Sequence, residues 1–311
     1  MNTREVVKHL ANAFHVREDE IGYAGLKDRR ATTTQTFSVN AKSEAPLAQI
    51  EGDRLRVLGV TRHRNKLKVG HLAGNRFRAR LAGGAEHEAE ARAILDELVR
   101  RGLPNYFGDQ RFGQERQNAA LGREVLQKGP RAAGPPWKAK FAVSALQSEL
   151  FNAVLDRRLD AAALDAALVG DVLQKTESHG LFVCEDAALD APRVASYEVS
   201  ATGPIPGPSM RLPTAGTVPS IWETEVLADA GLTIADFTKV RAIAEGTRRA
   251  VRARVTEPAV TVEGPDLWVT FALPAGAYAT VLIEELIGAP PSDGPQGIAA
   301  LNLAEGYPSV G

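Results

Sequence analysis

The chain has 311 residues, of which 44% are apolar and 24% are charged, and its net charge is −1. These values are typical of a soluble globular protein with one or two domains, and they give no support for a disordered or fibrous chain. No run of about 18 apolar residues occurs, so we expect neither a membrane span nor a secretion signal. Cys184 is the one cysteine, which excludes an internal disulfide and a cysteine-built metal site. We therefore expect a cytoplasmic protein without a metal.

The first part of the chain is predicted to form a helix, a turn and a strand. Residues 3–14 place Leu10 and Phe14 at helical spacing behind a Thr3 cap. Residues 32–39 follow a glycine-marked turn and have the β-branched pattern of a strand.

The stretch from Arg54 to Arg80 contains nine lysines and arginines and no acid. Its alternation predicts a β-meander, with the bases on one face of each strand and residues such as Leu67 and Phe77 on the other. A solvated sheet face is the commoner explanation, but like charges on neighbouring strands repel unless a polyanion neutralises them. We therefore expect a phosphate-binding face made of Arg62, Arg64, Lys66, Lys68, Arg76, Arg78 and Arg80.

The remainder of the chain is predicted to alternate helices and loops, with one strand pair. We expect a helix over 86–101, a Pro/Gly-rich linker over 128–138, a helix over 144–159 with Ser144 and Gln147 as its capping box, a loop over 202–219, a helical segment over 233–247, a strand pair over 259–276 and a last helix over 278–288.

This order of elements predicts a core of sheet and helices made from both ends of the chain and interrupted by an inserted unit. Pro/Gly-rich joints are usual at domain boundaries. We therefore expect a discontinuous core made of residues 1–130 and 251–311, interrupted by an insertion over 131–250.

Asp28 stands between Lys27 and the pair Arg29 and Arg30, directly before a predicted strand. Considered alone, an acid among bases is usually an exposed ion pair. The flanking glycines do not form the G-x-x-x-x-G-K-[ST] pattern, and no G-x-G-x-x-G follows a strand. Neither nucleotide hydrolysis nor hydride transfer is therefore indicated.

Three segments are far more specific when they are taken together. They are "GYAGLKDRRATTTQTFSV" at 22–39, "GNRFRARL" at 74–81 followed by "GLPNYFGDQRFG" at 102–113, and "LPAGAYATVLIEEL" at 273–286. In wording, order and spacing they resemble the TruD family of tRNA pseudouridine synthases, and the "TGPIPG" stretch resembles that family's inserted domain. The resemblance covers nearly the whole chain. It implies an α+β fold of the pseudouridine-synthase type, with a mixed, mainly antiparallel sheet, flanking helices and an inserted α/β domain, the TRUD domain.

The resemblance implies that a uridine of transfer RNA, in this family usually at position 13, is isomerised to its carbon-linked form without a cofactor. The family's catalytic aspartate falls on Asp28, and its uridine-contacting residues fall on Asn105, Phe107 and Tyr278. An ionised carboxylate is a suitable nucleophile for C1′ of the ribose or C6 of the uracil, and both stay open. An extruded base needs a stacking ring and hydrogen bonds to its polar edge.

The basic side chains complete the expected site. Lys27, Arg29 and Arg30 would favour the ionised form of Asp28, and we expect them to bind RNA together with the seven side chains of the phosphate-binding face. We expect this isomerase to bind tRNA and to bind neither a membrane nor a small-molecule cofactor. We also expect it to be a monomer.

The sequence departs from the family pattern at its start. Family members usually carry a further N-terminal segment that supplies a sheet strand, a base-contacting phenylalanine and a basic residue near the catalytic acid, whereas this sequence begins at the helix after it. We expect an exposed sheet edge and weak activity as a result. The alternative function is an RNA-binding or tRNA-folding protein with impaired catalysis. A metabolic enzyme for an anionic small molecule is a third alternative, disfavoured because no cofactor motif accompanies the basic strands.

Overall fold

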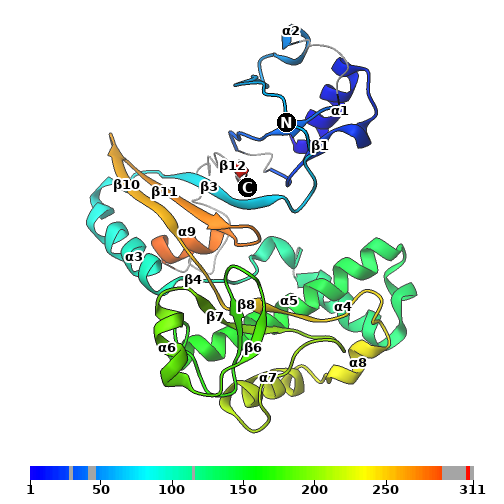
Figure 1. Ribbon diagram of the computed structural model, residues 1–311, viewed down its shortest axis with the longest axis vertical. Helices are drawn as coiled ribbons and strands as arrows, with labels where there is room; N and C mark the ends of the chain where they lie inside the picture. Colours follow the sequence, from blue (N-terminus) through cyan, green and yellow to red (C-terminus); the bar gives the residue numbers. More distant parts are fainter. Residues whose placement is uncertain (28–30, 41–46, 114–115, 289–305, 309–311) are drawn as a thin grey trace. The chain divides into compact units, whose positions relative to one another are not determined.

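The computed structural model describes residues 1–27, 31–40, 47–113, 116–288 and 306–308. The chain forms two compact units (Figure 1): the first comprises residues 1–95, 255–276 and 291–311, and the second comprises 96–254 and 277–290. Each unit contains antiparallel sheets and helices, so the predicted α+β class is confirmed. The predicted division into a core and an insertion stays a prediction.

A four-stranded antiparallel sheet forms the centre of the first unit, in the order β10-β11-β3-β12. Its strands are β3 (Leu72–Leu81), β10 (Thr256–Glu263), β11 (Asp266–Pro274) and β12 (Gly306–Pro308). Strand β3 alternates as expected: Ala79 is buried, and the ring of Phe77 stacks on that of Phe271 with centroids 5.3 Å apart. The pair β10 and β11 confirms the predicted strand pair.

The other elements of the first unit are short apart from two helices. They are α1 (Thr3–Phe14), η1 (Glu18–Glu20), β1 (Gly22–Tyr23), β2 (Phe37–Ser38), α2 (Leu47–Ile50), η2 (Ala85–His87) and the start of α3 (Glu88–Arg101). Helix α1 was predicted, but its cap is Asn2 and not Thr3: the Asn2 side chain accepts from the Glu5 backbone, and the Glu5 carboxylate accepts from the Asn2 backbone. Helix α3 ends before Gly102, whose φ of +96° suits the predicted glycine stop.

The predicted β-meander is wrong between residues 51 and 71. In the described part of the chain this stretch forms only an isolated bridge between Gly52 and Leu55. Its backbone forms individual hydrogen bonds instead of a strand ladder. The Leu67 N–H donates to the Ser38 hydroxyl at 2.9 Å, and the Gly70 N–H donates to the Ala24 carbonyl. The predicted strand over 32–39 is likewise reduced to β2.

The second unit has helix α5 (Pro136–Asp160) at its centre. One side of α5, including Val143 and Leu150, packs in a cluster with α4 and α7, while Phe151 and Leu155 pack in a cluster with the sheet. The close approach of α4 and α5 requires Gly122, because a Cβ there would lie 2.4 Å from the Ala142 carbonyl oxygen.

The second sheet is antiparallel throughout, in the order β6-β5-β7-β8. The elements of this unit besides α5 are β4 (Leu103–Pro104), η3 (Asp109–Arg111), α4 (Gln117–Lys128), η5 (Pro130–Ala133), β5 (Val172–Lys175), β6 (Leu181–Val183), α6 (Ala187–Ala195), β7 (Val199–Ile205), α7 (Val218–Asp229), α8 (Ile234–Thr238), β8 (Thr247–Ala250), β9 (Arg252–Ala253) and α9 (Ala279–Ile287). Helix α9 confirms the last predicted helix.

Several predictions for this unit need correction. Helix α5 begins at Pro136, so Ser144 and Gln147 lie inside it and form no capping box. Both side chains bind distant partners instead: Ser144 accepts a hydrogen bond from Arg111, and Gln147 donates to the Pro206 carbonyl at 2.7 Å. The predicted loop over 202–219 begins as β7, and the predicted helical segment over 233–247 contains only the short α8.

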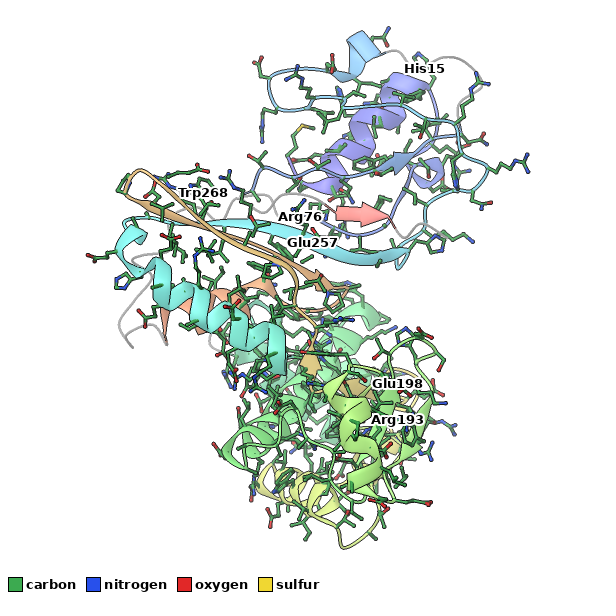
Figure 2. The ribbon with its side chains drawn as sticks, turned by 60° about the vertical axis from the view of Figure 1, so that its left-hand side comes forward. His15, Arg76, Arg193, Glu198, Glu257 and Trp268 are labelled. Carbon is green, nitrogen blue, oxygen red and sulfur yellow. The ribbon has the colours of Figure 1, made fainter. Side chains whose placement is uncertain are left out.

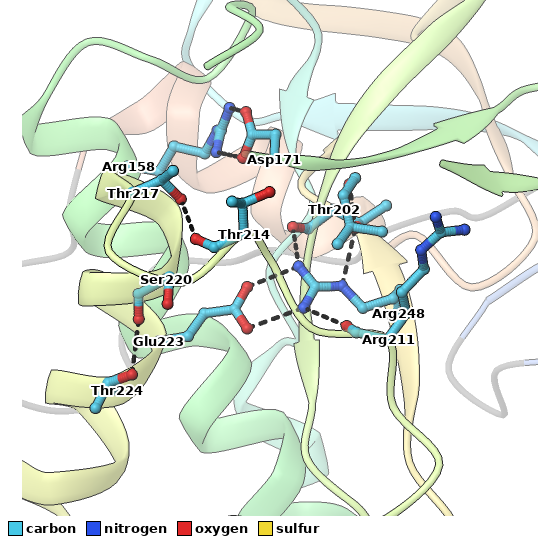
Figure 3. Close-up of polar contacts among 11 residues, drawn as sticks. Arg158, Asp171, Thr202, Arg211, Thr214, Thr217, Ser220, Glu223, Thr224 and Arg248 are labelled. Atoms are coloured by element: carbon cyan, nitrogen blue, oxygen red, sulfur yellow. Dashed lines mark hydrogen bonds and ion pairs between the residues drawn. The ribbon is translucent and has the colours of Figure 1, made fainter. Parts of the chain in front are cut away.

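Two buried ion pairs join the elements of the second unit (Figure 3). The Arg248 guanidinium donates to both oxygens of Glu223, at 2.9 and 2.7 Å, and also to Thr202. Arg158 binds both oxygens of Asp171 at 2.9 and 2.7 Å. Burial raises the pKa of Glu223, and the Arg248 guanidinium opposes this shift. These contacts fasten α7 and α5 to the sheet and its loops.

No helix in the described part of the chain is both long enough and apolar enough to cross a membrane. Among the described residues, no three His, Cys, Asp or Glu side chains are grouped so that they could hold a metal ion.

Candidate active site

The "PNYFG" motif begins at Pro104, the last residue of β4, which pairs with β9. The Asn105 backbone N–H donates to the Val251 carbonyl at 2.9 Å, and the Asn105 side-chain Nδ2 donates to the Ala250 carbonyl at 2.8 Å. The predicted uridine-contacting amide is therefore fixed against the end of β8.

Phe107 is held by helix α5. Its backbone N–H donates to Oδ1 of Asn152 at 3.0 Å, and Nδ2 of Asn152 donates to the Phe107 carbonyl at 2.9 Å. The Phe107 ring meets Phe151 edge-on, with centroids 5.5 Å apart. A backbone fastened by two hydrogen bonds and a packed edge give this ring a defined orientation.

The structure brings Phe107 and Tyr278 together, as the two predicted stacking side chains require. Their ring centroids are 6.1 Å apart at an interplanar angle of 65°. Gly108 allows this approach, because a Cβ at that position would lie 3.0 Å from Cδ1 of Tyr278 and 3.1 Å from the Thr280 hydroxyl. The glycine of the motif is thus explained by the position of the second ring.

Arg249 belongs to the same cluster, although it was not predicted. Its guanidinium lies 4.1 Å from the centroid of the Phe107 ring, and its Nη2 donates to Oδ1 of Asn105 at 2.6 Å. Burial lowers the pKa of Arg249 to about 10. The sequence signal that could have predicted Arg249 is the pair "RR" at 248–249. Neighbouring residues of a strand point to opposite faces, so Arg248 binds Glu223 while Arg249 binds Asn105 of the motif.

Arg111 connects the motif to the N-terminal half of α5. Its Nη2 donates to the Ser144 hydroxyl, and its guanidinium lies 5.9 Å from the Phe107 centroid. The neighbouring Tyr106 hydroxyl donates to Asp156 of the same helix, and burial raises the pKa of Tyr106. The motif loop therefore runs along α5 and is fastened to it at several points.

In the first unit, the loop that leads to Asp28 is tied down at Lys27. Asp28, Arg29 and Arg30 themselves lie outside the described residues. The Lys27 backbone N–H donates to the Thr3 hydroxyl at 2.8 Å, and its Nζ donates to Oδ1 of Asn75 on β3 at 2.6 Å. Burial lowers the pKa of Lys27.

Two positioning residues near this loop were not predicted, namely Gln35 and Asn75. Gln35 donates from Nε2 to the Gly25 carbonyl and accepts from the Thr3 hydroxyl through Oε1. Both amides occur inside the motif segments "TTTQTF" and "GNRF", and that was the signal for them. They fix the backbone immediately before the predicted catalytic acid.

The basic side chains divide into two groups. On β3, Arg76 pairs with Glu257 (Figure 2), Arg78 pairs with Glu263, and Arg80 pairs with Asp266. The premise that only a polyanion could neutralise these arginines is therefore wrong, because β10 and β11 supply the counter-charges.

The second group lies in residues 54–68, hereafter the basic segment. Its cations are exposed, and in the described part of the chain none of them forms an ion pair: Arg54, Arg56, Arg62, Arg64, Lys66 and Lys68. Lys66 does donate to the Asp19 backbone carbonyl. Within the described residues, the basic segment is thus exposed and cationic, and apart from the isolated bridge at Leu55 it pairs with no strand.

Comparison with known proteins decides the family. The model of the family "tRNA pseudouridine synthase D (TruD)" matches residues 1–134 and 135–286. The chain belongs to the TruD family. A tRNA pseudouridine synthase D of Anaeromyxobacter sp. (strain Fw109-5) is 42% identical over 92% of this chain and 82% of its own length.

Further TruD relatives agree. A protein of that name from Thermus thermophilus is 39% identical over 92% of this chain and 78% of its own length. A crystal structure assigned to TruD of Methanosarcina mazei matches with a TM-score of 0.72 at 23% identity, over 92% of this chain and 85% of that chain. The chain therefore shares the fold of that structure.

Proposed function

We propose that this chain converts a uridine of transfer RNA, at position 13, to pseudouridine, and that Asp28 is its nucleophile. The proposal is carried by one observation: the family's "PNYFG" and "LPAG" segments place the rings of Phe107 and Tyr278 6.1 Å apart beside the guanidinium of Arg249. Such a cluster of rings and polar groups suits the binding of an extruded base. We also propose residues 1–130 and 251–311 as the catalytic core and 131–250 as the inserted TRUD domain.

The reaction is an isomerisation, so it needs no oxidant, reductant or co-substrate. The Asp28 carboxylate adds to C1′ of the ribose or to C6 of the uracil, and the bond between N1 and C1′ breaks. The uracil turns within the site, and a bond forms between C5 and C1′. The proton leaves C5, N1 gains a proton, and the carboxylate is released unchanged.

The described side chains suit binding and orientation of the base. Phe107 offers a ring whose backbone is fixed by Asn152, while Arg249 occupies one part of its π surface. Asn105 already uses Nδ2 and Oδ1, but an amide has two N–H groups and two lone pairs, so one of each is left for the uracil edge. Tyr278 is half-buried and supplies the second ring.

For the RNA backbone we propose the basic segment, with Lys27, Arg29 and Arg30 nearer the reacting nucleotide. Exposed cations without carboxylate partners release counterions from phosphates most effectively. Because the β3 arginines are already paired with acids, we assign Arg76, Arg78 and Arg80 a smaller share of tRNA binding. Recognition would depend on tRNA shape more than on base edges.

The replacement Asp28→Asn tests the proposed chemistry. We expect it to reduce tritium release from tRNA labelled at C5 of uridine by on the order of 10⁴ or more, as for removal of other catalytic nucleophiles, while tRNA binding persists. Asp53→Asn, at an exposed acid directly before the basic segment, is the matched control and should keep full activity. Undiminished pseudouridine formation by the Asp28 variant would refute its role. A wild-type chain that binds tRNA without releasing tritium would instead favour the non-catalytic alternative.

A further inference from the structure

The N-terminal part of α5 carries two exposed aromatic side chains, Trp137 and Phe141. Their exposed fractions are 70% and 38%, respectively. The two residues are four apart in a helix, so their side chains are neighbours on one face. An exposed tryptophan beside a second ring is an uncommon arrangement for a merely solvated helix.

This face is continuous with the site around Phe107. Further along α5, the Ser144 hydroxyl accepts a hydrogen bond from Arg111, and the Asn152 side chain accepts one from the Phe107 backbone N–H. The Arg111 guanidinium lies 5.4 Å from the Phe141 centroid and 5.9 Å from the Phe107 centroid. Arg111 therefore links the ring of the motif to the exposed rings of the helix.

The sequence on either side of these rings is basic. Residues 125–148 contain Lys128, Arg131, Lys138 and Lys140 and no Asp or Glu. Lys128 pairs with Glu124 at 2.8 Å, whereas the other three are exposed and have no ion pair among the described residues. Nε of Arg111 is buried and has no hydrogen-bond partner within the described chain.

We propose that this aromatic and basic face of α5 binds an unpaired nucleotide of the tRNA next to the target uridine. The base stacks on Trp137 and Phe141, and Lys138 and Lys140 neutralise the adjoining phosphates. Rings interleaved with cations are the arrangement that single-stranded nucleic acid requires. The absence of acids over 125–148 favours a polyanion over a second protein surface. The inference rests on the proposed function, since Phe107 is taken to contact the target base.

The stacking can be observed without catalysis through tryptophan fluorescence. Wild-type protein and a Trp137→Phe variant are titrated with a short single-stranded oligouridylate. We expect the wild type to lose fluorescence on binding and the variant, which keeps a ring but lacks this indole, to show a clearly smaller loss. Equal losses in the two proteins would overturn the proposal, because the signal would then come from Trp222 or Trp268.

Affinity for a tRNA transcript provides the second measurement. Trp137→Ala should weaken binding roughly tenfold, the usual effect of removing one stacking ring. Leu189→Ala, on α6, removes another highly exposed apolar side chain, 73% exposed, and should leave affinity unchanged. If Trp137→Ala leaves tRNA affinity unchanged, or instead abolishes a dimer seen in sedimentation, the face is not a nucleotide site and the proposal is wrong.

These measurements separate the two proposals. If the wild-type protein releases tritium but shows no quenching that depends on Trp137, only the proposed role of the α5 face is refuted. Binding and quenching by a wild-type protein that forms no pseudouridine would refute the proposed catalysis and leave the nucleotide-binding face in place.

Discussion

The basic segment and strand β3 carry the same kind of charge but differ in what neutralises it. Arg78 and Arg80 on β3 pair with Glu263 and Asp266. In the described part of the chain, the cations of the basic segment have no such partners. Because a cation already held by a carboxylate has less to gain from a phosphate, the basic segment is the stronger candidate for the tRNA backbone.

The difference shows that an alternating charge pattern predicts a face but not its counter-charges. The partners of Arg78 and Arg80 are 185 and 186 positions away in the sequence. They come into register only because β11 pairs with β3 and β10 pairs with β11. Arginines on β3 therefore form ion pairs within the fold, whereas arginines of the basic segment stay available to bind a ligand.

The largest expected effect on stability comes from removing one partner of the buried ion pair between Arg248 and Glu223. Glu223→Gln leaves a buried guanidinium without its carboxylate, and we expect the free energy of unfolding to fall by about 3 kcal/mol or more. Urea denaturation followed by tryptophan fluorescence measures this loss. Glu124→Gln, at the exposed pair with Lys128, should cost less than about 1 kcal/mol. Equal losses for the two variants would show that burial does not set the value of the pair.

The next effect concerns tRNA affinity. Replacing Arg62, Arg64 and Lys66 together with Ala should weaken binding by at least about tenfold, and should reduce the slope of log affinity against log salt by about 1 for each lost phosphate contact. Binding measured at several salt concentrations provides both values. A variant in which Arg4 and Lys8, two exposed cations of α1, are replaced with Ala loses two of these three charges elsewhere on the surface and controls for the change in net charge. An unchanged slope would place the RNA backbone elsewhere.

Much of the fold could be predicted where local patterns decide the structure. The helix over 3–14, the helix ending at Gly102, the strand pair near 259–276 and the last helix all follow from apolar spacing and glycine stops. The basic segment was predicted wrongly as strands because alternation fits any extended chain, whereas a strand also needs a neighbour for its backbone. The Leu67 backbone donates instead to a single side chain, that of Ser38, and Gly70, just beyond the segment, donates to a single carbonyl.

The site was predictable only in part, for a related reason. The motifs led us to predict Asn105, Phe107 and Tyr278 as base-binding residues. That role stays a prediction, and the structure places the three side chains in one cluster with Arg249. Arg249 was missed because its contacts with Asn105 span 144 positions. Helix α5 was predicted to start eight residues too late, since prolines at its N-terminus looked like a linker although Pro is well suited to the first turn. That error hid the face carrying Trp137.

The smallest expected effect is that of removing Arg78, one of the paired arginines on β3. Arg78 lies 3.9 Å from the centroid of the Trp268 ring and pairs with Glu263 at an exposed position. Arg78→Ala should lower the free energy of unfolding by less than about 1 kcal/mol, because exposed ion pairs and cation–π contacts contribute little. Its tRNA affinity should change far less than that of the triple variant, since the charge of Arg78 is already neutralised. A loss of affinity as large as that of the basic segment would show that tRNA displaces Glu263, and would return β3 to the RNA-binding surface.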